Sequence, residues 1–185
     1  MAKLTYASNM SLDGWTEDAR GAFDWAPPQE EVFVFITELM RSKGTYLYGR
    51  RMYETLAVWE TDPSLARRSA LTADYARAWQ SANKVVFSST LAAPSTAKTR
   101  IERHFDPEAV ARLKASASED LLVGGPHLAR QALAAGLVDE LQLFVWPVVL
   151  GGRNPALPTD RRVDLELLEE RRFRGGVVHL RYRVL

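Results

Sequence analysis

Two adjacent glycines interrupt the most apolar part of this chain. The stretch from Leu121 to Gly152, LLVGGPHLARQALAAGLVDELQLFVWPVVLGG, starts as an apolar run, stops at Gly124 and Gly125, and continues through Pro126 into a helical pattern. Glycine costs roughly 0.5–1 kcal/mol relative to alanine inside a strand or helix, so a pair of glycines indicates that bare backbone is needed there. The segment predicts a strand, a turn and a helix, with either a tight turn or a bound molecule at the glycines.

Strand-like and helix-like segments alternate along most of the 185 residues. We expect strands at 4–7, 45–49, 84–89, 99–105, 120–125 and 138–152, the last bent near Pro147. We expect helices at 29–44, 50–59, 69–81, 107–116 and 126–136, the first stopped by Gly44 and the fourth capped by Asp106. Residues 8–25 read as a long loop and 151–155 as a turn. Residues 163–185 predict a hairpin around Gly175 and Gly176.

This order predicts an α/β fold in one domain, residues 1–185, with a mostly parallel central sheet flanked by helices and antiparallel strands at the C-terminus. The strand at 141–150 is apolar at nearly every position, so both of its faces should be covered. One chain does not obviously supply both covers, and we therefore expect a homodimer.

Composition excludes several classes of function. The net charge is +1, so the basic surface expected of a nucleic-acid-binding protein is missing. The N-terminus does not resemble a signal peptide, and the apolar run at 143–150 is too short to span a membrane. A cytoplasmic protein is the default expectation. There is no cysteine, and His104, His127 and His179 stand apart, so no metal site is expected.

Three of the predicted strands end in residues that suit a phosphorylated dinucleotide. Gly49-Arg50-Arg51, Ser88-Ser89 and Gly124-Gly125 each follow a strand, and ligands of α/β sheets bind at the carboxyl ends of strands. Helix N-termini attract phosphate, glycine lets it approach the backbone, and arginine binds a terminal phosphate. Each feature also has a plain structural reading, as a turn, a solvated side chain or a strand end; the conjunction favours a cofactor.

The motifs SLDG, YGRRMYE, KVVFSST, the glycine-pair segment and the closing ALP, in this order, resemble the dihydrofolate reductase superfamily. The resemblance is greatest to the branch that contains the reductase domain of the bifunctional riboflavin-biosynthesis deaminase-reductase and its stand-alone relatives. It implies a dihydrofolate reductase-like fold, NADPH as cofactor and commonly a dimer. It also implies a cofactor site made of Ser8, Asp13, Gly14, Gly49, Arg50, Arg51, Ser88, Ser89, Gly124, Gly125, Pro126, His127 and Leu128.

The resemblance gives these residues separate parts in the site. Gly49 and Arg50 correspond to the adenosine-phosphate site, with Arg51 beside it, and the two serines to the loop near the adenine ribose. The glycine pair, often joined by a cis peptide in that family, would lie over the pyrophosphate. Asp13 and Gly14 correspond to a mobile loop near the nicotinamide.

The chain departs from the family where dihydrofolate reductases have a carboxylate on their first helix. That position falls near Phe33, and Glu30 or Glu31 is a possible substitute. Trp15, Trp25, Phe33 and Trp146 are the candidate substrate residues, and such aromatic walls suit a flat, apolar molecule. We expect an NADPH-dependent reductase of a small, ring-containing substrate. Dihydrofolate reductase, 5-amino-6-(5-phosphoribosylamino)uracil reductase and a non-catalytic NADP(H)-binding sensor or assembly module remain as alternatives.

Overall fold

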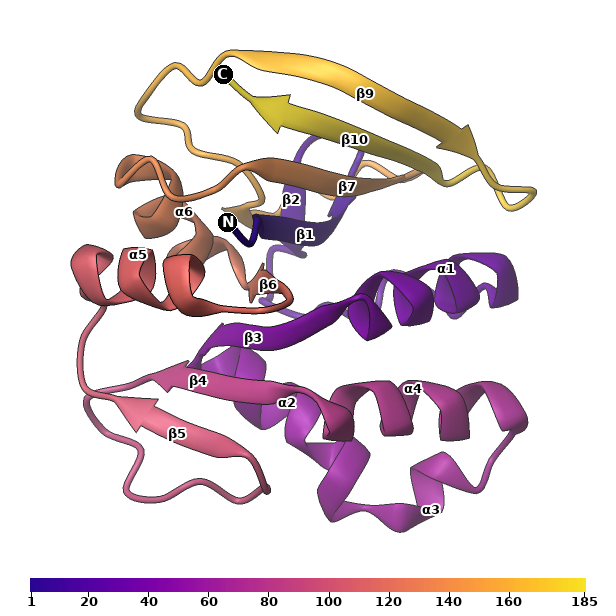
Figure 1. The fold of residues 1–185 in the computed structure, drawn as a ribbon. Helices are drawn as coiled ribbons and strands as arrows, with labels where there is room; N and C mark the ends of the chain where they lie inside the picture. The colour runs from indigo at the N-terminus through magenta and orange to yellow at the C-terminus, as the bar shows by residue number, and fades with distance from the viewer.

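An eight-stranded sheet runs through the computed structural model, which describes residues 1–185 (Figure 1). The strand order is β5-β4-β3-β6-β1-β7-β10-β9. The strands are β1 (Leu4–Ser11), β3 (Lys43–Gly49), β4 (Asn83–Phe87), β5 (Thr99–Glu102), β6 (Asp120–Gly124), β7 (Glu140–Trp146), β9 (Leu165–Arg172) and β10 (Val178–Val184). All pairs from β5 to β7 are parallel, and β10 is antiparallel to β7 and β9. The predicted sheet, mostly parallel with antiparallel C-terminal strands, is confirmed.

Helices cover both faces of this sheet. They are α1 (Glu30–Arg41), α2 (Arg50–Thr61), α3 (Pro63–Ala66), α4 (Ala70–Ser81), α5 (Pro107–Ser116) and α6 (Pro126–Ala134). Side chains alternate between the faces of a strand, so Leu47 of β3 packs with α5 and α6, whereas its neighbours Tyr46 and Tyr48 pack with α1, α2 and α4. None of the six helices combines the length and the apolar composition that a membrane crossing requires.

The helix caps follow from the sequence. Asp106 accepts a hydrogen bond from the backbone N–H of Glu108 at 3.0 Å and precedes Pro107, as predicted for the start of α5. Ser69 and Thr72 form a reciprocal capping box at the start of α4. The short helix α3 was not predicted; its N-cap Asp62 accepts from the N–H of Ser64.

Several predicted boundaries are wrong. The first helix ends at Arg41, and Gly44 lies inside β3, where an added Cβ would stand 2.6 Å from Glu119 Oε2. The strand predicted at 138–152 ends at Trp146, before Pro147, because proline has no N–H for the sheet. The first strand is longer than expected and reaches Ser11.

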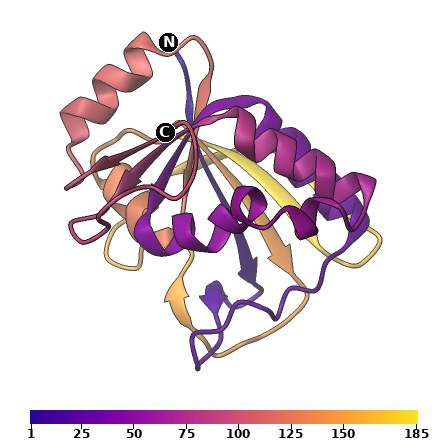
Figure 2. The same cartoon turned by 90° about the horizontal axis from the view of Figure 1, so that it is seen from below.

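A second, small sheet replaces the turn expected at 151–155. There β8 (Arg153–Pro155) pairs antiparallel with β2 (Trp15–Glu17), which lies in the predicted loop. Figure 2 shows this two-stranded sheet beyond the ends of β1 and β7. It carries the 8–25 segment over the carboxyl edge of the main sheet.

The C-terminal strands form the predicted hairpin. The N–H of Phe173 donates a hydrogen bond to the carbonyl of Val177 at 2.9 Å, which closes the hairpin at Gly175-Gly176.

The burial of β7 decides one argument about assembly. Strand β7 lies between β1 and β10, with Leu143 in the core beneath α6 and Phe144 in a cluster with α1. This chain therefore covers both faces of β7 by itself, and an uncovered face of β7 is no longer a reason to expect a homodimer. The homodimer stays a prediction.

Candidate functional site

A cavity of about 600 Å³ opens at the carboxyl ends of β1, β3 and β6. Its walls come from β1, the 8–25 segment, α1, and the first turns of α2 and α6. A second cavity of about 540 Å³ lies beside it, between α1, β1 and the segment before α4. The two cavities share Asn9, Ala26 and Ile36 and together form one cleft with two compartments.

The glycine pair forms the turn from β6 into α6 on the wall of the larger cavity. A Cβ on Gly124 would stand 2.7 Å from the Tyr48 ring, and Gly125 has a φ of +89°, which side chains rarely adopt. The resemblance implied a cis peptide here, but the structure contains none. His127 and Leu128 lie in the first helical turn, whose N–H groups have no partner within the helix. Gly124, Gly125, Pro126, His127 and Leu128 all line the cavity.

A cationic side chain stands at another end of the same cavity, where β3 passes into α2. Gly49 is the N-cap, and Arg50 donates to Glu54 at 2.8 Å and to Thr90 Oγ1 at 2.9 Å. Thr90 belongs to the turn after β4, where buried Ser88 accepts from the N–H groups of Thr90 and Leu91. Two of the three strand ends are thus joined through Arg50. Ser88 shapes the turn, and neither it nor exposed Ser89 lines the two cavities.

Arg51 takes part in a chain of polar contacts across the mouth of the cavity. It pairs with Glu17 at 2.6 Å and donates to the carbonyl of Gly21 at 3.0 Å. Glu17 also accepts from Asn154 Nδ2 at 2.6 Å, and Asn154 Oδ1 lies 3.1 Å from His127 Nε2. The chain links α2, β2, β8 and α6. Arg51 is therefore held by the 8–25 segment, whereas Arg50 faces the turn after β4.

Asp13 and Gly14 shape the loop after β1 and line neither cavity. The Asp13 carboxylate accepts from the N–H groups of Leu150 at 3.1 Å and Gly151 at 2.8 Å. A hydrogen bond from Ser11, together with these two N–H groups, lowers the pKa of Asp13 to about 2 despite some burial. Gly14 adopts φ +88°, a turn conformation. Both residues fix the path of the 8–25 segment.

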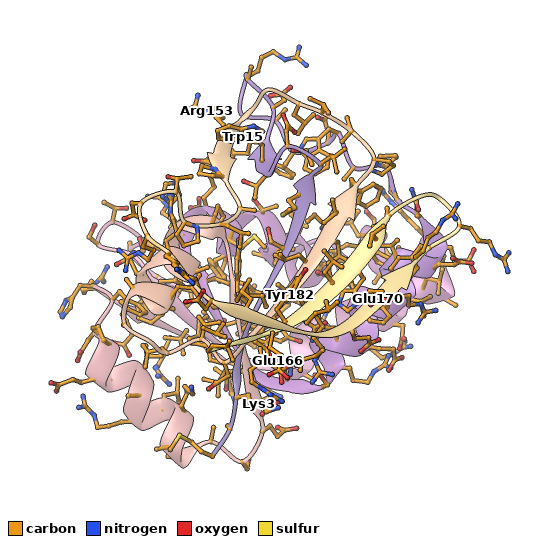
Figure 3. All side chains as sticks on the ribbon, turned by 90° about the horizontal axis from the view of Figure 1, so that it is seen from above. Lys3, Trp15, Arg153, Glu166, Glu170 and Tyr182 are labelled. Atoms are coloured by element: carbon orange, nitrogen blue, oxygen red, sulfur yellow. The ribbon has the colours of Figure 1, made fainter.

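The predicted aromatic residues separate into two groups. Trp25 lines the larger cavity and Trp146 the smaller, and their rings meet edge to face at 6.4 Å. Phe33 lines the smaller cavity and stacks on Tyr75 at 5.1 Å. Trp15 lies on the small sheet beside Arg153, outside both cavities (Figure 3). Ser8 lines the larger cavity and donates to the Asn9 carbonyl at 3.0 Å.

The inner part of the larger cavity is apolar and carries two phenols. Ile36, Leu39, Met40, Leu56, Leu122 and Phe144 line it. Burial raises the pKa of Tyr75, and burial above all raises the pKa of Tyr48, whose hydroxyl has no hydrogen-bond partner. Both phenols therefore stay protonated at neutral pH. The one carboxylate on the cavity wall, Glu17, is already paired with Arg51.

Sequence reasoning missed Asn9, Glu17, Asn154, Tyr48 and Tyr75. Tyr48 stands directly before Gly49, and that position on a strand end was a usable signal. The contacts of Glu17 and Asn154 join residues 137 positions apart and left no local signal.

Comparison with known proteins agrees with this architecture. The family model of the RibD C-terminal domain matches residues 2–179. The uncharacterized protein YyaP of Bacillus subtilis (strain 168) is 29% identical over 178 residues, covering 94% of this chain and 90% of YyaP.

Solved structures show the same fold at low identity. RibD of Acinetobacter baumannii superposes with a TM-score of 0.70 at 17% identity, over 100% of this chain and 58% of that one. Dihydrofolate reductase from Enterococcus faecalis, complexed with NADP(H), gives a TM-score of 0.67 at 14% identity over 98% of this chain and 96% of that one. The fold is dihydrofolate reductase-like, as the sequence motifs implied. With nearly its whole length matched by the family model, the chain belongs to the family of the RibD C-terminal domain.

Proposed function

We propose that this protein is an NADPH-dependent reductase of a small, ring-containing molecule. The observation that carries the proposal is one cavity lined both by the glycine pair Gly124-Gly125 and by Arg50. The similar E. faecalis enzyme is a reductase complexed with NADP(H), and RibD of A. baumannii has the same fold.

The residues present fit this cofactor. The crowded Gly124 and the positive φ of Gly125 leave backbone without side chains at the start of α6, where the helix dipole and free N–H groups favour a pyrophosphate. Arg50, next to Thr90, would bind the 2′-phosphate of the adenosine. When bound, NADPH supplies the hydride. The protein itself orients both molecules and excludes water with the 8–25 segment and the apolar wall.

The smaller cavity is a poor fit to dihydrofolate, so we expect the substrate to be a different molecule. Phe33 stands near the position of the family carboxylate and stacks on Tyr75. Glu31 pairs with Arg174 at 3.0 Å and lines neither cavity, and Glu30 is exposed at the rim of the smaller one. No acid lines the inner wall beside Phe33, so support for protonating a pterin is missing.

Calorimetric titration of NADPH and NADH tests the cofactor. We expect Arg50→Ala to weaken NADPH roughly 10- to 150-fold, since a charged hydrogen bond contributes about 1.5–3 kcal/mol, and to leave NADH nearly unchanged. Arg51→Ala is the matched control, because Arg51 is held by Glu17 and Gly21; its effect should be smaller.

Equal affinity of the wild type for NADH and NADPH would contradict a 2′-phosphate site at Arg50. Tight NADPH binding without turnover of any ring substrate would instead favour the sensor, the alternative from another class.

A further inference from the structure

Asn9 stands where the two compartments of the cleft meet. It is one of the three residues that line both cavities, and the other two, Ala26 and Ile36, have no polar side-chain atom. Asn9 lies on β1, directly opposite Phe144 of β7, and its side chain is exposed within the open cleft. A molecule that reaches from the glycine pair into the smaller cavity must pass this carboxamide.

The orientation of the Asn9 carboxamide is fixed by Trp146. The indole N–H of Trp146 lies 2.9 Å from Asn9 Oδ1. Because an indole nitrogen can only donate, the atom that faces it must be the amide oxygen. The Nδ2 group, with two N–H donors, makes no hydrogen bond within the protein. Trp146 is itself only 5% exposed and is held against Trp25, so the amide is presented by a rigid support.

Apolar and aromatic side chains surround this donor. Phe33 and Trp59 line the smaller cavity, Tyr75 lines the larger, and Ile36 lines both. Arg68 and Glu30, the charged residues of the smaller cavity, are exposed at its rim. A pair of N–H donors among apolar side chains suits a neutral molecule, because a buried charge needs a partner of opposite sign.

We propose that Asn9 binds the substrate, donating a hydrogen bond to a carbonyl oxygen or ring nitrogen of a neutral, planar ring compound, and that Trp146 is the positioning residue for its carboxamide. The proposal rests on the proposed reductase function and specifies the substrate class of the same cleft. The rings stack between the aromatic side chains of the two compartments, and the acceptor atom lies at their junction.

The test measures binding in the absence of NADPH, with coumarin as the probe. Coumarin is neutral and planar and has one ring carbonyl. Naphthalene has the same shape without an acceptor, and coumarin-3-carboxylate adds a negative charge. We expect the wild type to prefer coumarin to both in calorimetric titrations. We also expect coumarin to shift the side-chain amide signals of Asn9 in a ¹H–¹⁵N correlation spectrum.

Asn9→Leu keeps the size of the side chain and removes its donors. We expect it to weaken coumarin roughly 3- to 10-fold, the range of one neutral hydrogen bond, and to leave naphthalene unchanged. Trp146→Phe should weaken coumarin less and broaden the Asn9 amide signals, since the oxygen loses its donor. Asn83→Leu, at an exposed position at the start of β4, is the matched control and should change nothing.

Three results would overturn the proposal: no coumarin binding at millimolar concentration, equal binding of coumarin and naphthalene to the wild type, or unchanged coumarin affinity in Asn9→Leu. Failure of the cofactor proposal is a separate result. It would appear as weak NADPH binding to the wild type, while coumarin affinity would still depend on Asn9.

Discussion

At the residue scale, the glycine pair is the part of the site that sequence predicts best. Its signal is local, since two glycines between a strand and a helix mark a turn of bare backbone whatever the rest of the chain does. Asn9 is the opposite case. Its importance comes from a hydrogen bond to Trp146, 137 residues away, and nothing near Asn9 in the chain indicates that partner.

The prediction at this scale compares two glycines with positive φ at opposite ends of α6. Gly125 has φ +89° and lines the cavity, whereas Gly136 has φ +66° and lies beyond the last turn. Alanine has room at both, because its Cβ would meet Met52 Cβ at 3.6 Å in one case and nothing within 4 Å in the other. Gly136→Ala should lower the free energy of unfolding by about 1–2 kcal/mol. Gly125→Ala should lower it by about 1–3 kcal/mol, because the φ of 89° and ψ of 131° at Gly125 lie outside the left-handed helical region. NADPH affinity should fall only in Gly125→Ala, because its methyl group occupies backbone space that the pyrophosphate needs.

Chemical denaturation gives the two stabilities and calorimetry the two affinities. If both variants bind NADPH like wild type, the glycine pair serves only as a turn. Gly125→Val would be a poorer test, because a β-branched residue at this φ adds strain that lowers stability as well.

At the element scale, periodicity predicts which segments form helices but not where they stop. The apolar spacing of α1 and the cap of α5 were sufficient to predict both helices. The end of α1 was predicted wrongly because Gly44 pairs into β3, and β8 was missed because its partner β2 lies more than a hundred residues earlier, as the pairing of Glu17 with Arg153 shows. Contacts between distant strands decide these boundaries, and local patterns do not contain them.

The helix α1 also carries the prediction about dihydrofolate. Phe33 faces Tyr75 and Trp59, with ring centroids 5.1 and 6.2 Å away. This helix therefore presents an aromatic ring near the position where the resemblance to dihydrofolate reductases predicts a carboxylate. General acid support is typically worth 10²–10⁴-fold, and we expect dihydrofolate turnover to be lower by that factor than in dihydrofolate reductases. The measurement is NADPH oxidation with dihydrofolate at neutral pH, with NADPH binding checked on the same sample. Turnover of several per second would show that Glu30 or another acid replaces the missing group.

At the scale of the whole molecule, one carboxylate forms ion pairs with two neighbouring segments of the sheet, at the end of the sheet opposite the cleft. Glu140, at the start of β7, pairs with Lys3 at 2.6 Å and with Arg181 of β10 at 2.9 Å. Lys3 lies at the other end of the molecule from Trp15 (Figure 3). The Glu140 side chain is only 5% exposed, so its two cations are its main compensation for lost water.

This cluster predicts how stability responds to acid. Burial alone would raise the pKa of Glu140, but the hydrogen bonds and charges of Arg181 and Lys3 outweigh it and lower the pKa to about 2. The native protein therefore binds this proton more weakly than the unfolded chain. Its contribution to stability is complete above about pH 4.5 and is lost as the pH falls towards about 2. Glu140→Gln should cost roughly 1.5–3 kcal/mol at neutral pH.

The same variant should show a shallower loss of unfolding free energy between about pH 4.5 and about 2 than the wild type, because this group no longer titrates. Urea denaturation across that range measures both curves. Glu102→Gln is the control, since Glu102 pairs with Arg100 at 3.0 Å on the surface, with about half of each side chain exposed, and such pairs contribute little. Parallel curves for wild type and Glu140→Gln would mean that Glu140 titrates normally in the folded protein, and that its two cations stabilise the sheet by packing rather than by charge.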